Sequence, residues 1–288
     1  MDNYRVENLN CLEFLKSIPD ASVDAVITDP PYAEVDRDYG RISESDWANL
    51  MHEVVFECKR VLKPSGSAMF VIQPNFEKIG TMRTWVWDFM SWSAKNWNMV
   101  QDVYCWNYNT MPGAGVQEKW GLLRGSLKYL VWLGSPDCYK NQKSVLLRAQ
   151  DMQVLQRQKS KMKYDDERRY SPSGHSRRHS TSNDFAIRNG GITPTNVLPI
   201  IPTSGKESAG AQGHGAGTPN ELVRWWIRYI TKENDVILDP FLGSGTTGIQ
   251  AIRMGRKILG CEKETNYYEI ALKRISDEHN MRLDKFLE

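Results

Sequence analysis

Short apolar runs alternate with amphipathic stretches at both ends of the chain. In the first half each apolar run is short, rich in β-branched residues and followed by proline, glycine or polar residues, which is typical of buried strands. The stretches between them repeat their apolar positions with helical spacing. The pattern predicts strands at 23–28, 68–72, 99–106 and 127–133 and helices at 44–62 and 81–94. This alternation favours an α/β fold with a Rossmann-like, mostly parallel sheet and helices on both faces.

The C-terminal part repeats this arrangement with clearer signals at the ends of its elements. Thr218-Pro219-Asn220-Glu221 matches a capping box with proline at the first helical position, so a helix is expected to begin there. The rest of the pattern predicts a strand at 236–238, a glycine-containing turn, a helix at 246–254 closed by Gly255, and a strand at 257–261. Together these elements form a complete β-loop-α-β unit.

Between the two halves the periodicity fades, and polar and basic residues take over. We interpret 134–213 as an insert that recognises a partner and not as part of the sheet, with 145–163 compatible with one basic helix. Residues 1–133 and 214–288 are then expected to form two halves of a single domain.

The composition narrows the class of protein. The 288-residue chain is 40% hydrophobic and 25% charged, which is ordinary for a globular protein. No stretch approaches the roughly 18 apolar residues of a membrane span, and the first residues lack the basic-then-apolar pattern of a signal peptide. The five cysteines lie far apart without a Cys-x-x-Cys pair, which argues against a disulfide framework and a zinc site. We therefore expect a cytoplasmic protein.

Charge becomes informative once it is located along the sequence. The formal net charge is +2, yet residues 137–180 hold eleven basic against five acidic side chains. A basic segment on an otherwise acidic body fits contact with nucleic-acid phosphates, and a solvated loop without a partner is the alternative. The candidate contact residues are Lys140, Lys143, Arg148, Arg157, Lys159, Lys161, Lys163, Arg168, Arg169, Arg177 and Arg178.

The first candidate for chemistry is Asp29-Pro30-Pro31-Tyr32, directly after the predicted strand at 23–28. Ligands of open α/β sheets bind outside the carboxyl ends of strands, so this position favours a binding site. The prolines restrict the backbone and would hold the Asp29 side chain and the Pro30 carbonyl oxygen as two rigid acceptors beside an aromatic ring. Such a site suits a planar group with an exocyclic amine, on which Tyr32 stacks. A rigid turn with a surface tyrosine is the alternative.

The second candidate is the glycine-rich segment after the strand at 236–238. Its glycines let the backbone approach a ligand closely, and the following helix offers unpaired N–H groups. Glu262 ends the next strand, where a carboxylate can accept hydrogen bonds from a ribose diol. No Gly-Lys-Ser/Thr follows, so a nucleoside without phosphate fits better than a nucleoside triphosphate; a turn that only packs a helix on a strand is the alternative. The candidate cofactor-contacting residues are Asp239, Pro240, Phe241, Gly243, Ser244, Gly245, Thr246, Thr247 and Glu262.

Together, Asp-Pro-Pro-Tyr at 29–32 and Asp-Pro-Phe-x-Gly-Ser-Gly-Thr-Thr at 239–247 resemble the β group of S-adenosylmethionine-dependent amino-methyltransferases of DNA. In that group the catalytic motif, the recognition region and the cofactor motif follow one another in this order. Residues 60–66 resemble the fifth motif of the family, 127–133 the eighth, and 214–222 the His-Pro-Thr-x-Lys-Pro-x-x-Leu entry to the cofactor pocket. The resemblance covers 1–133 and 214–276.

Two stretches depart from the family pattern. The Gly-Asp pair that the family usually has near its first helix is replaced by Leu9-Asn10-Cys11. In the pocket-entry motif the usual lysine falls on Thr218, and the His-Pro-Thr triplet reads His214-Gly215-Ala216.

The resemblance implies a catalytic half at 1–133, a target-recognition insert at 134–213 that binds double-stranded DNA, and a cofactor-binding half at 214–288. It implies S-adenosylmethionine as the cofactor, with Asn10 and His214 among the residues that contact it, and Asp29 to Tyr32 as the catalytic residues that receive a flipped-out base. Adenine N6 is the favoured acceptor because aspartate at the first motif position resembles the adenine enzymes. Cytosine N4, an RNA substrate and a catalytically silent nucleic-acid-binding subunit are the alternatives.

Direct attack of the base amine on the methyl carbon needs neither a metal nor a covalent enzyme intermediate. His175 and His179 lie four residues apart in an arginine-rich segment, which favours a solvated or phosphate-contacting loop over a metal site. We expect the tryptophans of one region to pack in the core or at the interface of a homodimer, with a base-stacking platform as the alternative. These are Trp85, Trp87, Trp92, Trp97 and Trp106.

Overall fold

The computed structural model describes residues 3–37, 40–107, 121–123, 125–147, 191–200 and 217–287. The chain separates into two compact units, of which the larger comprises Met1–Lys140 and Asn196–Glu288 and the smaller Asn141–Thr195. The described part of the smaller unit holds a 3-10 helix, η1 (Gln142–Val145), and an antiparallel bridge between Leu147 and Ile192. Of the predicted basic helix, only its first residues are described, and they are not α-helical.

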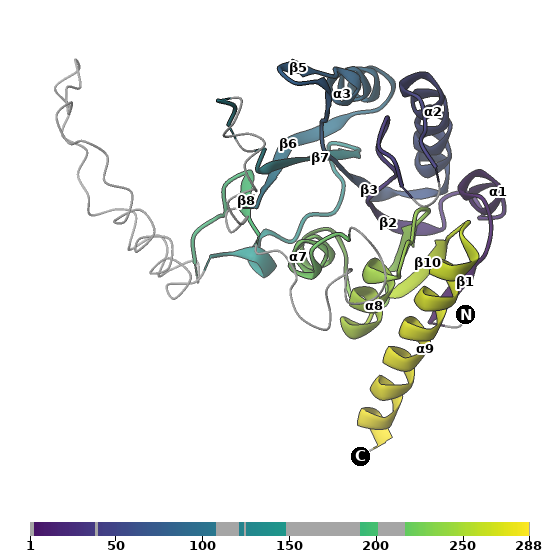
Figure 1. Ribbon diagram of the computed structural model, residues 1–288. Helices are drawn as coiled ribbons and strands as arrows, with labels where there is room; N and C mark the ends of the chain where they lie inside the picture. Colours follow the sequence, from purple (N-terminus) through teal and green to yellow (C-terminus); the bar gives the residue numbers. More distant parts are fainter. Residues whose placement is uncertain are drawn as a thin grey trace, which may run out of the picture. The chain divides into compact units, whose positions relative to one another are not determined.

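The larger unit is built on one eight-stranded sheet (Figure 1). Five neighbouring strands run parallel, and β7 pairs antiparallel with both β3 and β6. The mostly parallel sheet that the sequence predicted is thus confirmed. Its strands, in spatial order, are β1 (Tyr4–Glu7), β10 (Lys257–Cys261), β9 (Val236–Asp239), β2 (Val23–Thr28), β3 (Leu62–Ile72), β7 (Leu127–Gly134), β6 (Met99–Trp106) and β8 (Val197–Pro199).

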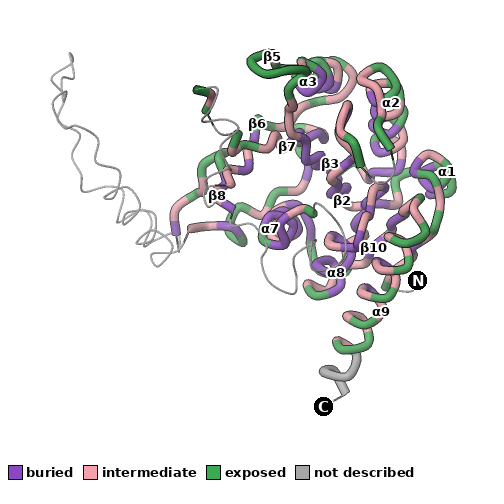
Figure 2. The backbone as a smooth tube through the Cα atoms, in the orientation of Figure 1, coloured by how far each residue is buried: buried purple, intermediate pink, exposed green. Residues whose placement is uncertain are grey.

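Helices cover both faces of this sheet, as predicted. The residues of β2 alternate between two hydrophobic cores, because Ala25 and Ile27 face one side and Val26 the other. One core packs against α1 (Cys11–Lys16), α2 (Glu44–Val61) and α3 (Trp85–Asn96). The other packs against α7 (Asn220–Ile230), α8 (Thr246–Arg253) and α9 (Thr265–Leu287). Figure 2 shows the buried positions of the strands between exposed outer helix faces.

The structure corrects the sequence prediction at two places. The helix expected from residue 81 begins at Trp85, because residues 76–82 form a small hairpin of β4 (Phe76–Lys78) and β5 (Thr81–Met82). The interpretation that 134–213 stays outside the sheet is wrong for β8, which pairs in parallel with β6 at the sheet edge. Residues 134–140 and 196–200 of the predicted insert belong to the larger unit.

The tryptophans of the α3 region mainly pack inside the larger unit. Trp85 is buried, and its ring centroid lies 4.5 Å from that of Trp47. Trp92 stacks on His52 at 3.7 Å, and Trp97 packs against the same core. Trp87 is the exception, because 40% of it is exposed. Packing in the core is therefore confirmed for Trp85.

Candidate active site

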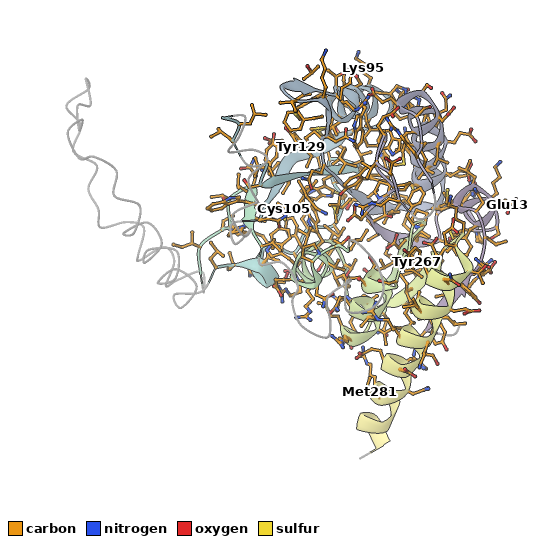
Figure 3. The ribbon with its side chains drawn as sticks, in the orientation of Figure 1. Glu13, Lys95, Cys105, Tyr129, Tyr267 and Met281 are labelled. Atoms are coloured by element: carbon orange, nitrogen blue, oxygen red, sulfur yellow. The ribbon has the colours of Figure 1, made fainter. Side chains whose placement is uncertain are left out.

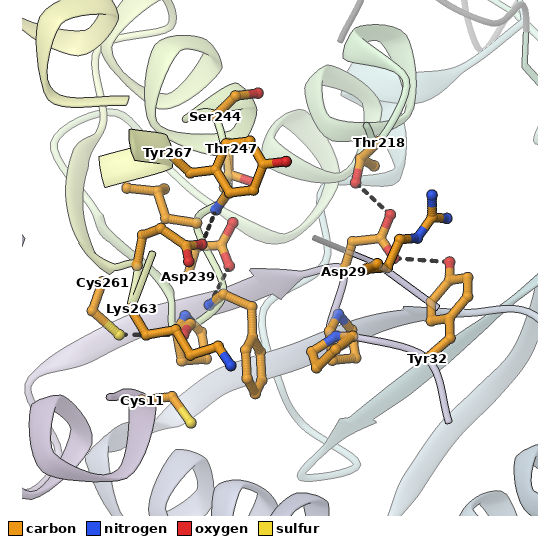
Figure 4. A pocket seen from close by; sticks show the side chains of 18 of the residues that line it. Cys11, Asp29, Tyr32, Thr218, Asp239, Ser244, Thr247, Cys261, Lys263 and Tyr267 are labelled. Atoms are coloured by element: carbon orange, nitrogen blue, oxygen red, sulfur yellow. Dashed lines mark hydrogen bonds between the residues drawn. The ribbon is translucent and has the colours of Figure 1, made fainter. Parts of the chain in front are cut away.

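The two glycine- and proline-rich loops lie side by side at the centre of the sheet. β2 and β9 are parallel neighbours, with Val26 opposite Leu238, and the chain leaves β2 toward β3 on one side and β9 toward β10 on the other. A parallel sheet opens a crevice where the strand order reverses in this way. The loops after both strands line a cavity of about 500 Å³ at this point (Figure 4).

Asp29 is the centre of a polar cluster on one side of the cavity. The Tyr32 hydroxyl donates to Oδ1 of Asp29 at 2.8 Å, and the Thr218 hydroxyl donates to Oδ2 at 2.8 Å (Figure 4). The Lys128 ammonium lies 3.4 Å from the same Oδ2. The carboxylate is thus fixed by residues of three separate segments while 22% of its side chain stays exposed to the cavity.

The position of Thr218 corrects the predicted capping box. α7 begins at Asn220, so Pro219 occupies the N-cap and not the first helical turn. The Thr218 hydroxyl hydrogen-bonds to Asp29 instead. Thr218 therefore connects the entry of α7 to the Asp-Pro-Pro-Tyr motif.

Side chains from outside the motif hold its backbone. The indole Nε1 of Trp47, on α2, donates to the Pro31 carbonyl oxygen at 2.5 Å, and the Asn75 amide donates to the Ala33 carbonyl oxygen at 2.8 Å. Asn75 in turn accepts a hydrogen bond from Nε1 of Trp85 at 2.9 Å. These contacts add to the restriction by the prolines, so Asp29 projects from a turn with little conformational freedom.

The glycine-rich loop forms the opposite side of the cavity. Gly243 and Gly245 have φ angles of +53° and +87°, which side chains rarely adopt, and a Cβ on Gly245 would lie 3.0 Å from the Cα of Ala271. Glu262 accepts hydrogen bonds from the backbone N–H groups of Gly243 and Glu264, each at 2.9 Å. Burial raises the pKa of Glu262. The predicted loop and acidic residue are therefore brought together around one cavity.

Asp239 links the two loops. Its buried carboxylate accepts hydrogen bonds from the Thr28 hydroxyl at 2.6 Å and from the backbone N–H of Phe241 at 3.1 Å, and Thr247 also contributes a hydrogen bond. Thr28 immediately precedes Asp29. Burial raises the pKa of Asp239 to about 6, and these hydrogen bonds oppose the rise.

This raised pKa predicts a pH-dependent stability. An aspartate in the unfolded chain titrates near about 3.9. The folded state therefore keeps a proton that the unfolded state has lost, and the Asp239 contribution to stability falls as pH rises through about 4 to 6. Asp239→Asn keeps an acceptor oxygen and does not titrate. The wild type should lose about 1 kcal/mol more of its free energy of unfolding between pH 5 and pH 8 than Asp239→Asn does. Urea denaturation at the two pH values measures this difference.

The matched control is Asp277→Asn on the exposed surface of α9, which should retain the wild-type pH dependence. A pH dependence in Asp239→Asn equal to that of wild type would show that the Asp239 carboxyl does not titrate in this range.

Two cysteines border the cavity, but neither is suited to act as a nucleophile. Cys11 and Cys261 line it and are both buried. Burial raises the pKa of the Cys11 thiol to about 11 and raises that of Cys261 further. Since the thiolate is the reactive form, the raised pKa disfavours either thiol as a nucleophile at neutral pH.

The remaining predicted residues fall into three groups. Asn10 lines the cavity and its side chain caps α1 by accepting from the Leu12 N–H at 2.9 Å. Lys140 donates to the Pro136 carbonyl oxygen at 2.9 Å, and Lys143 lies in η1. His214, which was predicted to contact the cofactor, lies outside the described residues. So do the other candidate phosphate-contacting residues, namely Arg148, Arg157, Lys159, Lys161, Lys163, Arg168, Arg169, Arg177 and Arg178.

Comparison with known proteins places this site in a family. The family model described as DNA methylase (N6_N4_Mtase) matches residues 23–273, which include both loops and all of the sheet except β1. The chain belongs to the N6/N4 DNA methylase family. Within the described residues, no cluster of three or more histidine, cysteine or acidic side chains is arranged to hold a metal ion, and none of the helices is long and apolar enough to span a membrane.

Similar proteins include an adenine methyltransferase and a cytosine-N4-specific methyltransferase of DNA. The type II methyltransferase M.PvuII of Proteus hauseri is 25% identical over 93% of this chain and 82% of its own length. The DNA adenine methyltransferase YhdJ of Escherichia coli K12 is 26% identical over 92% of this chain and 80% of its own length.

Solved structures confirm the DNA methylase fold. The PvuII cytosine-N4-specific DNA methyltransferase superposes with a TM-score of 0.70 at 19% identity, covering 99% of this chain and 94% of its own. A DNA modification methylase of Thermus thermophilus, solved in complex with S-adenosyl-L-methionine, has a TM-score of 0.61 at 23% identity and covers 96% of this chain and 94% of its own.

Proposed function

We propose that this DNA methylase transfers a methyl group from S-adenosylmethionine to the exocyclic N6 of an adenine in double-stranded DNA. The observation that carries the proposal is the position of Asp29: a carboxylate fixed by Tyr32 and Thr218 faces the same cavity as a glycine-rich loop and its acidic partner Glu262. A cavity of this size accommodates a nucleoside-sized cofactor and a base.

The residues of the cavity fit S-adenosylmethionine. Gly243 lines the cavity and lets the loop backbone approach the ligand, whereas Gly245 packs against Ala271 of α9. Glu262 presents carboxylate oxygens to a ribose diol. When bound, the cofactor supplies an electrophilic methyl group on a sulfonium. The protonated thiols of Cys11 and Cys261 favour direct transfer to an amine over a route through a cysteine adduct.

In the proposed reaction the target nucleotide leaves the duplex, at a cost of about a few kcal/mol, and its base enters beside Tyr32. The Asp29 carboxylate and the Pro30 carbonyl oxygen accept hydrogen bonds from the two N–H groups of the amine and favour the tetrahedral geometry of the attacking nitrogen. The amine lone pair forms the N–C bond as the C–S bond breaks and its electron pair passes to sulfur. The methylated nitrogen then loses one proton, for which Asp29 is the adjacent acceptor.

We propose adenine as the methylated base because of two similarities to known adenine enzymes. Aspartate at the first position of the catalytic motif resembles the adenine enzymes, and YhdJ is an adenine methyltransferase. Cytosine N4 is the second candidate, because the PvuII enzyme of known structure is cytosine-N4-specific. Both bases offer an amine to the same two acceptors, so the mechanism is the same for either.

Two further parts of the proposal concern partners. We propose that the basic residues of 137–180 contact the DNA phosphates, which gives a steep loss of affinity with salt. We also propose a homodimer, supported by apolar side chains at the surface of the α2–α3 side: Phe56, Ile79 and Trp87 are 50%, 53% and 40% exposed.

The experiment is transfer of labelled methyl from S-adenosylmethionine to unmethylated genomic DNA, followed by digestion to nucleosides. We expect the label in N6-methyladenine. Label in N4-methylcytosine would retain the mechanism and correct the base. No label on DNA while S-adenosylmethionine still binds would replace the proposal by an RNA enzyme or by a catalytically silent binding subunit.

A further inference from the structure

Lys128 is a nearly buried cation in the candidate active site that belongs to neither motif loop. It is the second residue of β7 and pairs with Cys105 of β6 in the sheet. Only 14% of its side chain is exposed, and its ammonium lies 3.4 Å from Oδ2 of Asp29 and 5.8 Å from the centroid of the Tyr32 ring. The cation therefore lies beside both of the side chains that are proposed to hold the base.

The position of Lys128 can be compared with the hydrogen-bonding groups on the edge of each base. In adenine and cytosine the exocyclic amine lies next to a ring nitrogen with a free lone pair, N1 in adenine and N3 in cytosine. In guanine and thymine the same edge carries a carbonyl oxygen next to an N–H group. A carboxylate beside an ammonium is complementary to the amine-and-lone-pair edge and repels the reversed one.

We propose that Lys128 donates a hydrogen bond to the ring nitrogen adjacent to the reacting amine and so positions the base and selects its class. An ammonium has three protons, so a contact with Asp29 leaves donors for a second acceptor. This assignment rests on the proposed function, because it concerns the base bound by that same site.

The role is one of positioning and not of activation. A hydrogen bond to the ring nitrogen draws electron density into the ring and away from the amine, which on its own lowers the nucleophilicity of the amine. The benefit of Lys128 is therefore orientation of the amine toward the methyl group and rejection of a base whose edge is reversed. The acceptors Asp29 and Pro30 supply the activation.

The test compares duplexes that carry adenine or 1-deazaadenine at the methylated position. The analogue keeps the amine and replaces N1 by a C–H group. The wild-type kcat/KM for the 1-deazaadenine duplex should be about 10 to 100 times lower than for the adenine duplex, which is the usual loss for a hydrogen bond to a charged group. Lys128→Met should methylate both duplexes at rates within about twofold of each other, because the donor is gone.

Two further variants separate this contact from a structural role. Lys128→Gln keeps an uncharged donor and should retain part of the discrimination. Lys95→Met, on the exposed end of α3 (Figure 3), should retain all of it. If cytosine proves to be the substrate, 3-deazacytosine replaces the analogue.

Several results would overturn the assignment. Discrimination in Lys128→Met equal to that of wild type, or an equal loss of rate on both duplexes with the preference intact, would reduce Lys128 to a structural partner of Asp29. A wild type that methylates the analogue as well as adenine would exclude the contact altogether. A wild type that methylates no DNA would instead refute the proposed function, and this assignment with it.

Discussion

Replacing Asp29 by alanine is expected to lower kcat for methyl transfer by about 10²- to 10³-fold, the usual effect of removing one positioned group that stabilises a transition state. The substitution removes the acceptor that Tyr32 and Thr218 hold in place. The cofactor loop, with Glu262 bound to the backbone of Gly243, stays intact. Rates should be measured with labelled methyl groups under single-turnover conditions.

The control for the Asp29 variant is S-adenosylmethionine affinity, measured by calorimetry. It should change by less than about threefold, because Asp29 and Glu262 belong to different loops. Asp29→Asn keeps an acceptor oxygen, so its kcat for methyl transfer should lie between those of the alanine variant and the wild type. If the alanine variant fails to bind the cofactor, or transfers methyl at the wild-type rate, the catalytic role of Asp29 is wrong.

Trp226→Ala is expected to destabilise the protein by about 3 to 5 kcal/mol, the typical cost of deleting a large aromatic side chain from a core. Trp226 lies on α7 with no exposed surface, and its ring centroid is 5.3 Å from that of Trp132 in β7, in an edge-to-face arrangement. Chemical denaturation followed by circular dichroism gives the free energy of unfolding directly.

Trp226→Phe is the matched control, because it retains an aromatic ring at the same place. The indole Nε1 of Trp226 has no hydrogen-bond acceptor among the described residues. The phenylalanine variant therefore loses volume but also removes a buried unpaired donor, and its cost should be less than half that of alanine. A loss as large as that of alanine would mean that the indole nitrogen has a partner.

Much of the fold follows from local sequence pattern. The helix at 44–61 and the strands β2 and β9 have compact apolar signals bounded by prolines, glycines or caps, and they lie where the pattern predicts. Other elements lack such a signal. β1 buries one of its four residues, and β8 has three residues, of which Leu198 is buried. The antiparallel direction of β7 depends on its partners and not on its own sequence.

In the candidate site, too, some residues are predicted by local sequence and others are brought there only by the fold. Proline and glycine mark both motif loops in the sequence because the backbone needs them there, so Asp29 and Gly243 could be found. Lys128 and Thr218 lie in stretches that resemble the eighth motif and the pocket-entry motif of the family, but neither resemblance indicates a contact with Asp29. Only the fold brings the two side chains to the carboxylate.

The pairing of β2 with β9 at the centre of the sheet has a consequence for synthesis of the protein. β2 ends at Thr28, and its neighbour β9 begins at Val236, about two hundred residues later. At about 5 to 20 residues per second, the ribosome needs about 10 to 40 s to make that stretch. During this time β2 is an open, apolar edge of a half-formed sheet, the kind of edge that invites aggregation. The pairing that covers this edge of β2 can form only when the last quarter of the chain has been made.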